Sequence, residues 1–246
     1  MAFNPNAYKP AKQKVLPVVL LLDLSSSMRG NKIESLYDAT VAMIKSFDEQ
    51  KIREVQIQLS IITFGKDIEL HTPFNAVENL VEVPLEKFIA NGMTPLGMAL
   101  NMAKDMLEDK DVVPRPRYKP AVVLVSDGYP TDDWRIPLDK FISDGSTAKT
   151  QRFSVGIGSD YDYDMLKQFA GDDENMFQAG TAEELASRFK VITDSISLRS
   201  RSVNPNEIKS SPLIEKQQHT TPIKNESVRI ENIDIEEDDD EDEFEF

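Results

Sequence analysis

Residues 15–27 have the sequence VLPVVLLLDLSSS, an almost wholly apolar octet followed by an aspartate and a run of serines. Eight apolar residues are too few for a free-standing helix, so the octet is predicted to be a β-strand buried on both faces. Strands of that kind occur in parallel sheets that are covered by helices on both sides. Asp23 then marks the end of the strand and the beginning of a polar loop.

Apolar runs alternate with segments of helical periodicity along the rest of the chain. Strands are predicted at 54–64, 68–72, 121–126, 153–158 and 176–179, and helices at 33–47, 85–89, 96–107, 138–142, 165–170 and 181–192. A predicted turn at 65–67 makes the strands on either side of it an antiparallel edge hairpin. Together these elements predict an α/β fold: a doubly wound, mostly parallel six-stranded sheet with helices on both faces and one antiparallel edge strand.

Five oxygen-bearing residues lie at or just after the ends of apolar runs: Asp23, Ser25 and Ser27 in LLDLSSSMRG, Thr94 in NGMTPLGMAL, and Asp127 in VVLVSDGYPTDDW. The βα loops of an open parallel sheet converge at one edge, so these residues are expected to meet there. Hydroxyl and carboxylate oxygens suit a hard cation such as Mg²⁺, with Mn²⁺ or Ca²⁺ as alternatives. A zinc centre is not expected, because the chain has no cysteine and its two histidines lack ligand-like spacing.

Asp23, Ser25 and Ser27 form a D-x-S-x-S motif, and in this motif the chain resembles von Willebrand factor A domains. The resemblance implies a metal-ion-dependent adhesion site, which in that family takes a threonine and an aspartate from later loops. Thr94 and Asp127 match these two in order and context. The resemblance further implies that the hydroxyls contact the ion directly or nearly so, while the two aspartates act through water.

The resemblance extends over residues 16–196. Within the family, the stretches SDGYPTDDW and NGMTPLGMAL are most similar to the bacterial TerY-like branch, which is linked to tellurite and chemical stress resistance. That branch implies a role in stress response beside kinase or phosphatase partners.

The chemistry of the motif favours binding over catalysis. An ion surrounded largely by neutral hydroxyls keeps much of its charge, so an Asp or Glu carboxylate of a partner protein can complete its shell. The predicted function is a non-catalytic, metal-dependent protein-binding adaptor with no small-molecule substrate.

Two alternatives to the adaptor are considered. A Mg²⁺-dependent phosphotransferase of the haloacid-dehalogenase type needs a second aspartate as acid/base where this chain has Ser25, although Asp132 and Asp133 resemble its later acidic pair. The other alternative is a metal-free scaffold in which DLSSS only caps a helix.

Two residues near the motif, Thr94 and Trp134, have two interpretations each. Thr94 precedes Pro95 and matches a helix start, with threonine as the N-cap and proline in the first helical position. Beside the D-x-S-x-S loop, metal binding is the favoured role for its hydroxyl. Tyr129 and Trp134 flank Asp127 and are predicted to form a partner-binding rim. The alternative for Trp134 is that it packs under the loop.

Composition sets the domain organisation. The 246 residues fit an N-terminal arm at 1–14, one domain at 15–198, and a disordered linker and acidic tail at 199–246. The net charge of −15 is concentrated in residues 231–246, which hold 11 acidic residues and no basic one. The tail residues Phe244 and Phe246 are candidates for a docking motif, although the tail could also occlude the metal site or only add solubility.

The same composition excludes some classes of partner. The chain has no basic stripe for nucleic acid, and no apolar stretch approaches the roughly 20 residues that span a membrane. The protein is therefore expected to be cytoplasmic, in agreement with the absence of cysteine.

Overall fold

The computed structural model describes residues 14–51, 54–113, 117–202 and 206. Within them, six strands form one sheet of order β3-β2-β1-β4-β5-β6. The strands are β1 (Lys14–Asp23), β2 (Val55–Phe64), β3 (Ile68–Ala76), β4 (Ala121–Ser126), β5 (Gln151–Ile157) and β6 (Met176–Ala179). Every pair is parallel except β2–β3, which is antiparallel, and this confirms the predicted fold class.

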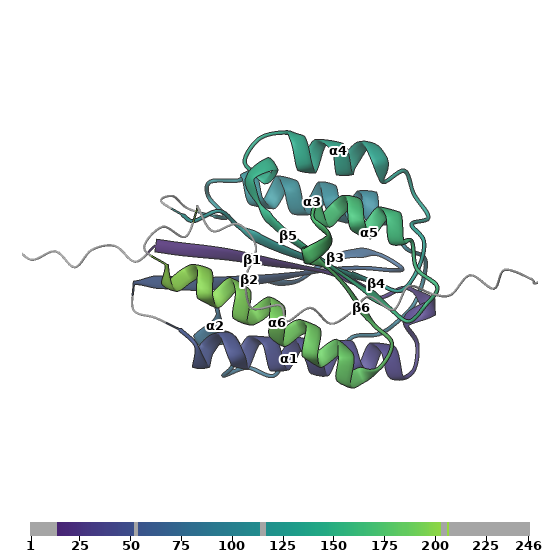
Figure 1. Ribbon diagram of the computed structural model, residues 1–246, viewed down its shortest axis with the longest axis horizontal. Helices are drawn as coiled ribbons and strands as arrows, with labels where there is room; N and C mark the ends of the chain where they lie inside the picture. Colours follow the sequence, from purple (N-terminus) through teal and green to yellow (C-terminus); the bar gives the residue numbers. More distant parts are fainter. Residues whose placement is uncertain (1–13, 52–53, 114–116, 203–205, 207–246) are drawn as a thin grey trace, which may run out of the picture. The chain divides into compact units, whose positions relative to one another are not determined.

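Helices cover both faces of the sheet (Figure 1). On one face lie α1 (Asn31–Glu49), α2 (Val77–Leu80) and α6 (Ala182–Arg201), and on the other lie α3 (Leu96–Glu108), α4 (Arg135–Ser143) and α5 (Tyr163–Ala170). Short 3-10 turns are η2 (Ser26–Met28), η3 (Thr147–Lys149) and η4 (Asp173–Asn175). Within the described residues, none of these helices is both long and apolar enough to cross a membrane.

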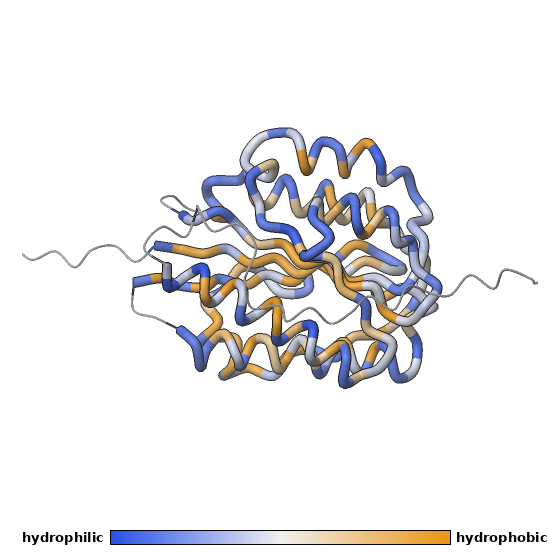
Figure 2. Tube along the Cα trace, in the orientation of Figure 1, coloured by the Kyte–Doolittle hydropathy of each residue, from blue (hydrophilic) through white to orange (hydrophobic). Residues whose placement is uncertain are grey.

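Strand β1 supplies the core on both sides of the sheet. Leu20 and Leu22 pack with the α1 and α6 cluster, whereas Val19 and Leu21 pack with the α3, α4 and α5 cluster. All four side chains are 0% exposed. Figure 2 shows the consequence as hydrophobic strands running through the middle of the fold, between helices of mixed hydropathy. A strand that is buried on both faces needs apolar side chains at successive positions, which explains the uninterrupted apolar octet.

The order of the strands creates a switch point beside β1. The chain adds β2 and β3 on one side of β1 and then returns to add β4, β5 and β6 on the other side. The loops that follow β1 and β4 therefore leave the carboxyl edge of the sheet in opposite directions. In open α/β sheets this is where ligands bind.

The structure corrects one predicted helix. Residues 84–90 are not helical, and the short helix α2 lies before them. Phe88 is 7% exposed and Ile89 is 79% exposed, so these neighbours point to opposite sides, which is the behaviour of an extended segment. The predicted arm before Lys14 and the tail residues Phe244 and Phe246 lie outside the described residues.

We expect Leu20→Ala to lower the free energy of unfolding by about 2–5 kcal/mol, because it removes a fully buried side chain from the middle of β1. Leu70→Ala is the matched control, since Leu70 on edge strand β3 is 43% exposed. Its expected cost is under about 1 kcal/mol. Urea unfolding measures both values, and equal losses would contradict the central position of β1.

Candidate functional site

The loop after β1 is held in place by its neighbours. Leu24 N donates to Phe64 O at 2.7 Å, Asn91 N donates to Leu24 O at 2.7 Å, and Ser26 N donates to Gly92 O at 3.0 Å. The side chain of Met28 is 0% exposed and anchors the end of the loop in the core. The loop therefore presents its serines from a backbone that is bonded to two other segments.

Ser25 and Ser27 form a short chain of hydroxyls that ends on Asp127. Their Oγ atoms are 2.9 Å apart, and Ser27 Oγ donates to Asp127 Oδ1 at 2.7 Å. A serine hydroxyl carries one proton, so Ser25 is the donor to Ser27. The hydroxyl protons thus point toward Asp127, and both serine oxygens keep lone pairs. Ser25 and Asp127 are buried, whereas Ser27 is exposed and opens the cluster to solvent.

Asp23 lies beneath this chain and is completely buried. Its carboxylate accepts hydrogen bonds from Ser126 Oγ at 2.6 Å and from Ser25 N at 2.8 Å. Burial raises the pKa of Asp23 to about 6, although the bonds from Ser126 and Ser25 act in the opposite direction. A cation bound nearby would stabilise the charged carboxylate and lower this pKa.

Thr94 reaches the same place from the loop before α3. A Cβ atom added at Gly128 would lie 3.7 Å from Ser27 Oγ and 3.9 Å from Thr94 Oγ1. The two hydroxyls therefore both lie beside Gly128, at van der Waals distance from the position that a side chain at residue 128 would occupy. Thr94 is 5% exposed. The structure thus brings Asp23, Ser25, Ser27, Thr94 and Asp127 to one edge of the sheet.

Thr94 does not cap α3, which was the alternative interpretation of this residue. Helix α3 begins at Leu96, with Pro95 at the N-cap, and no side chain of that residue caps the helix. The carboxylate of Asp132 instead accepts from Gly97 N and Met98 N, each at 3.0 Å. A cap supplied by a distant loop leaves the Thr94 hydroxyl free for another role. Asp132 thus has a structural function, because its carboxylate caps the N-terminus of α3.

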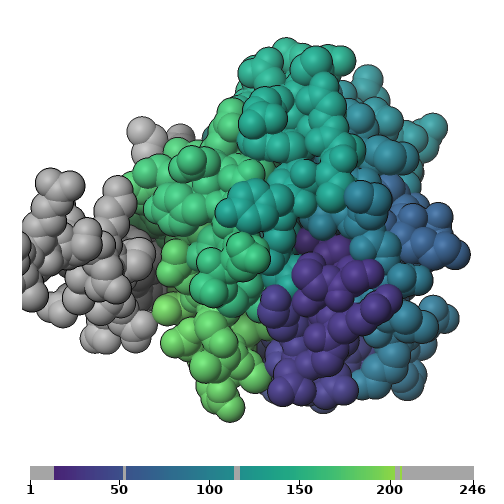
Figure 3. Space-filling model, turned by 90° about the vertical axis from the view of Figure 1, so that its right-hand side faces the viewer, coloured from purple at the N-terminus to yellow at the C-terminus, as the bar shows by residue number. Residues whose placement is uncertain are grey.

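Lys32 is a member of the cluster that the sequence analysis missed. Its Nζ atom lies 2.5 Å from Asp127 Oδ2, so each oxygen of that carboxylate has a partner. Figure 3 looks onto this edge and shows the purple segment that follows β1 against the teal and green segments of later loops. The available signal was a lysine just after the Gly30 turn, next to a D-x-S-x-S motif.

Ser126 was also missed, although its position in the sheet explains its role. The register pairs Leu22 with Val125, which places Asp23 beside Ser126 at the ends of β1 and β4. The sequence signal for Ser126 was its position: it ends an apolar strand and directly precedes Asp127.

The predicted rim residues separate into an exposed and a buried one. Tyr129 is 59% exposed beside the site, but Trp134 is 7% exposed and belongs to the core under α3, α4 and α5. The Arg135 guanidinium covers the Trp134 ring at 4.8 Å from its centroid. Trp134 therefore supports the loop from the core and is not a rim residue. Met93 and Ile89, in the segment before Thr94, have exposed apolar side chains like Tyr129.

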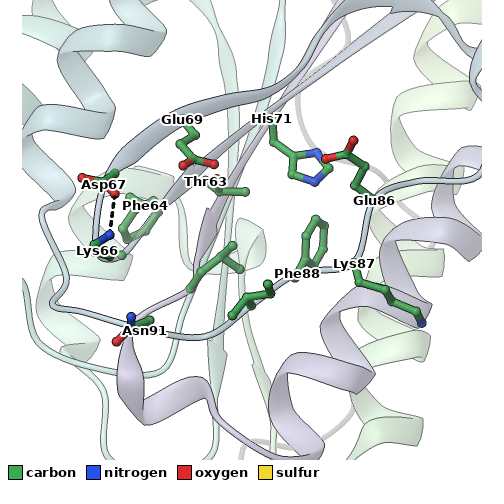
Figure 4. Close-up of a pocket in the computed structure, with 13 residues that line it drawn as sticks. Thr63, Phe64, Lys66, Asp67, Glu69, His71, Glu86, Lys87, Phe88 and Asn91 are labelled. Atoms are coloured by element: carbon green, nitrogen blue, oxygen red, sulfur yellow. Dashed lines mark ion pairs between the residues drawn. The ribbon is translucent and has the colours of Figure 1, made fainter.

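A groove lies next to the site, between the β2–β3 turn and the segment before Thr94 (Figure 4). Leu24 and Asn91 belong both to this groove and to the backbone contacts of the serine loop. Phe88 lies in the groove wall, and charged side chains of both signs surround it: Lys66, Asp67, Glu69, Glu86 and Lys87. The groove therefore adjoins the serine loop on the same part of the surface.

The donor set decides which ions the cluster could hold. Among the described residues, there is no group of three or more His, Cys, Asp or Glu side chains that could hold a metal ion. The cluster offers three hydroxyls and two carboxylates instead. Such an all-oxygen set fits a hard cation.

Comparison with known proteins agrees with this architecture. The family model of the von Willebrand factor type A domain matches residues 18–190. Inter-alpha-trypsin inhibitor heavy chain H2 of Sus scrofa is 27% identical over 181 residues, which cover 72% of this chain and 19% of the relative. The chain thus spans about a fifth of the length of the curated relatives it matches.

Solved structures show the same fold. Proximal thread matrix protein 1 from the mussel byssus superposes with a TM-score of 0.60 at 17% identity, over 74% of this chain and 48% of that one. A structure of the same mussel protein with a zinc-occupied MIDAS motif has a TM-score of 0.56 at 16% identity, over 74% of this chain and 45% of that one. At these identities, the likeness establishes the fold alone.

We expect Asp132→Ala to lower the free energy of unfolding by about 1–2 kcal/mol, because it removes the cap of α3. Asp133→Ala is the matched control, since it deletes a neighbouring exposed carboxylate. Chemical denaturation compares the two variants. An equal effect on stability would show that Asp132 is not the cap.

We expect Asp23→Asn to stabilise the metal-free protein above pH 6. Asp23 has a folded-state pKa near 6, above its ordinary value, so the folded protein binds more protons between about pH 4 and pH 6. Stability therefore falls as pH rises through this window, by on the order of 2–3 kcal/mol from this group. Urea unfolding in EDTA at pH 4.5 and 7.5 tests this, and an unchanged pH dependence in the variant would contradict it.

Proposed function

The chain belongs to the von Willebrand factor type A family, and from this premise we propose that it is a non-catalytic adaptor that captures a protein partner through a divalent metal ion. The observation that carries the proposal is the hydroxyl cluster at the switch point. Ser25, Ser27 and Asp127 are joined by hydrogen bonds, and the hydroxyls of Ser27 and Thr94 lie beside the same glycine, Gly128.

The oxygen donors support Mg²⁺ as the ion, because hydroxyl and carboxylate oxygens are the ligands that this small, hard cation prefers. The Ser25 and Ser27 hydroxyls already lie 2.9 Å apart, joined by a hydrogen bond that a bound ion would replace. Ca²⁺ takes the same oxygen ligands and is an alternative. Mn²⁺ is the expected substitute, and zinc is disfavoured because the cluster lacks histidine and cysteine ligands.

Each residue of the cluster has a proposed role. Ser25, Ser27 and Thr94 would hold the ion through their hydroxyl oxygens, and the bound ion would offer an open coordination position to a carboxylate. Asp23 fixes the loop backbone through Ser25 N, and Asp127 orients the Ser27 hydroxyl. Because direct donors are mostly neutral, the ion keeps the positive charge that attracts an acidic group.

The surroundings support a protein as the ligand. Met93 is 64% exposed, Ile89 is 79% exposed and Tyr129 is 59% exposed, and all three belong to loops that border the cluster. Exposed apolar side chains around a polar centre are a common arrangement in protein interfaces. The expected partner surface has an Asp or Glu residue flanked by apolar side chains, rather than a nucleic acid or a membrane.

Two features support a binding role over the phosphotransferase alternative. Position 25, where that chemistry needs an acid/base, is a serine whose hydroxyl bonds to Ser27. Asp132, one of the two acidic residues that resembled the later pair, caps α3. Hydrolysis of a phosphomonoester with Mg²⁺ that is abolished by Asp23→Asn would overturn the non-catalytic assignment.

The finer part of the proposal concerns the biological setting. The stretches SDGYPTDDW and NGMTPLGMAL resemble the TerY-like branch, so we place the adaptor in a cytoplasmic, bacterial stress-response system of the tellurite-resistance type. Kinase or phosphatase partners are expected there. A pull-down with wild type and Asp23→Ala, each with Mg²⁺ or EDTA, tests this, and partners that bind equally in all four samples would contradict metal-bridged capture.

We expect the double substitution Ser25→Ala and Ser27→Ala to weaken Mg²⁺ and Mn²⁺ binding by at least about 100-fold, because it removes two of the three hydroxyl donors. Ser26→Ala is the matched control in the same loop and should bind within about twofold of wild type. Isothermal titration calorimetry and thermal shifts with and without EDTA measure the effect. The absence of metal binding to wild type, or an equal loss in Ser26→Ala, would refute the site.

A further inference from the structure

Building on the proposed function, we infer that Lys32 sets the net charge of the metal site. Its ammonium group gives the loaded site the excess positive charge that selects acidic partners, and it does so at the expense of metal affinity. Nothing in the D-x-S-x-S motif supplies such a cation.

Lys32 is fixed between the loops that follow two neighbouring strands. Its Nζ pairs with Asp127 after β4, and the Asp127 side chain is fully buried. A Cβ added at Gly158, directly after β5, would lie 3.7 Å from Lys32 Cε and 3.8 Å from Nζ. Gly158 has a φ of +80°, a conformation that favours glycine. Its N donates to Ala179 O at 2.8 Å, which fixes the position of this loop beside the lysine. The Lys32 side chain is only 38% exposed.

The position of Lys32 on its helix argues against a role in helix stability. It is the second residue of α1, where the unpaired N–H groups and the helix dipole disfavour a positive charge. Glu34 in the same turn has the sign that suits this terminus. The carboxylate of Asp127 offsets the unfavourable placement of Lys32. The lysine is therefore positioned for the cluster and not for the helix.

The charges of the cluster define what Lys32 contributes. With both aspartates ionised, Asp23, Asp127 and Lys32 together carry one net negative charge, and a divalent ion converts this to one net positive charge. Without Lys32 the empty site would carry two negative charges, and the loaded site would be neutral. Removal of the lysine should therefore strengthen capture of the metal ion and weaken capture of a carboxylate.

Other cations near the edge do not fill this role. Arg29 is exposed and donates to Ala90 O and Asn91 Oδ1, each at 3.3 Å, so it braces the neighbouring loop. Lys66 and Lys87 line the adjacent groove, where Asp67 and Glu86 also lie. Among the residues that the structure describes, Lys32 is the cation that pairs with a carboxylate of the cluster.

The test compares Lys32→Gln, Lys32→Arg and Lys45→Gln in the full chain. Lys45 is an exposed lysine further along α1 and serves as the matched control for loss of one charge. Mn²⁺ is titrated at pH 7.5 and low salt, and binding is followed by electron paramagnetic resonance. We expect Lys32→Gln to bind Mn²⁺ about tenfold more tightly, the scale of one unit charge a few ångströms away in a partly exposed site. Lys32→Arg and Lys45→Gln should stay within about twofold of wild type.

The second measurement uses acetate as the probe of the loaded site. At saturating Mn²⁺, acetate binding to Lys32→Gln should be about tenfold weaker than to wild type, and Lys32→Arg should restore it. Equal Mn²⁺ and acetate affinities in wild type and Lys32→Gln would overturn the inference while leaving the metal site standing. A Lys32→Arg variant that behaves like Lys32→Gln would also overturn it, because the role would then be packing. A wild type that binds no Mn²⁺ would overturn both this inference and the proposed function.

Discussion

The hydrogen bond from Ser27 to Asp127 joins loops that are 100 residues apart in the chain, and the rest of the site depends on it. It orients the Ser27 proton, which in turn makes Ser25 the donor in the next bond and leaves lone pairs on both serine oxygens. The same carboxylate takes Lys32 on its other oxygen. One buried aspartate thus organises hydroxyl orientation and local charge together.

This arrangement places two carboxylates at buried positions. Asp23 and Asp127 lie at the ends of β1 and β4 and are themselves buried, and burial, together with the nearby charge of Asp127, raises the pKa of Asp23. The apolar core of β1 supplies the stability that tolerates these carboxylates. A cation would relieve part of their cost, so the site is built to favour an occupant. Function and stability oppose each other at this edge, as at many binding sites.

The sequence predicted the parts of the fold that depend on local pattern. The octet before Asp23 was predicted as a strand from its short length, the hairpin from its turn residues and the helices from their apolar spacing, and the sheet followed from the alternation of these elements. The helix predicted at 85–89 was wrong, because Leu85, Phe88 and Ile89 have a helical spacing that the structure does not use. A pattern of only three apolar residues is compatible with a helix and with an extended segment. Tertiary contacts then decide which of the side chains are buried.

By itself, the sequence determined that hydroxyl and carboxylate residues end several strands, and that a family motif connects them. Only the tertiary structure decided which groups are partners. The capping of α3 by Asp132, the pairing of Ser126 with Asp23, the burial of Trp134 and the contact of Lys32 with Asp127 all join residues that are distant in the chain. Strand register and loop convergence set these contacts, and neither is encoded in any local stretch, because both arise when the sheet assembles.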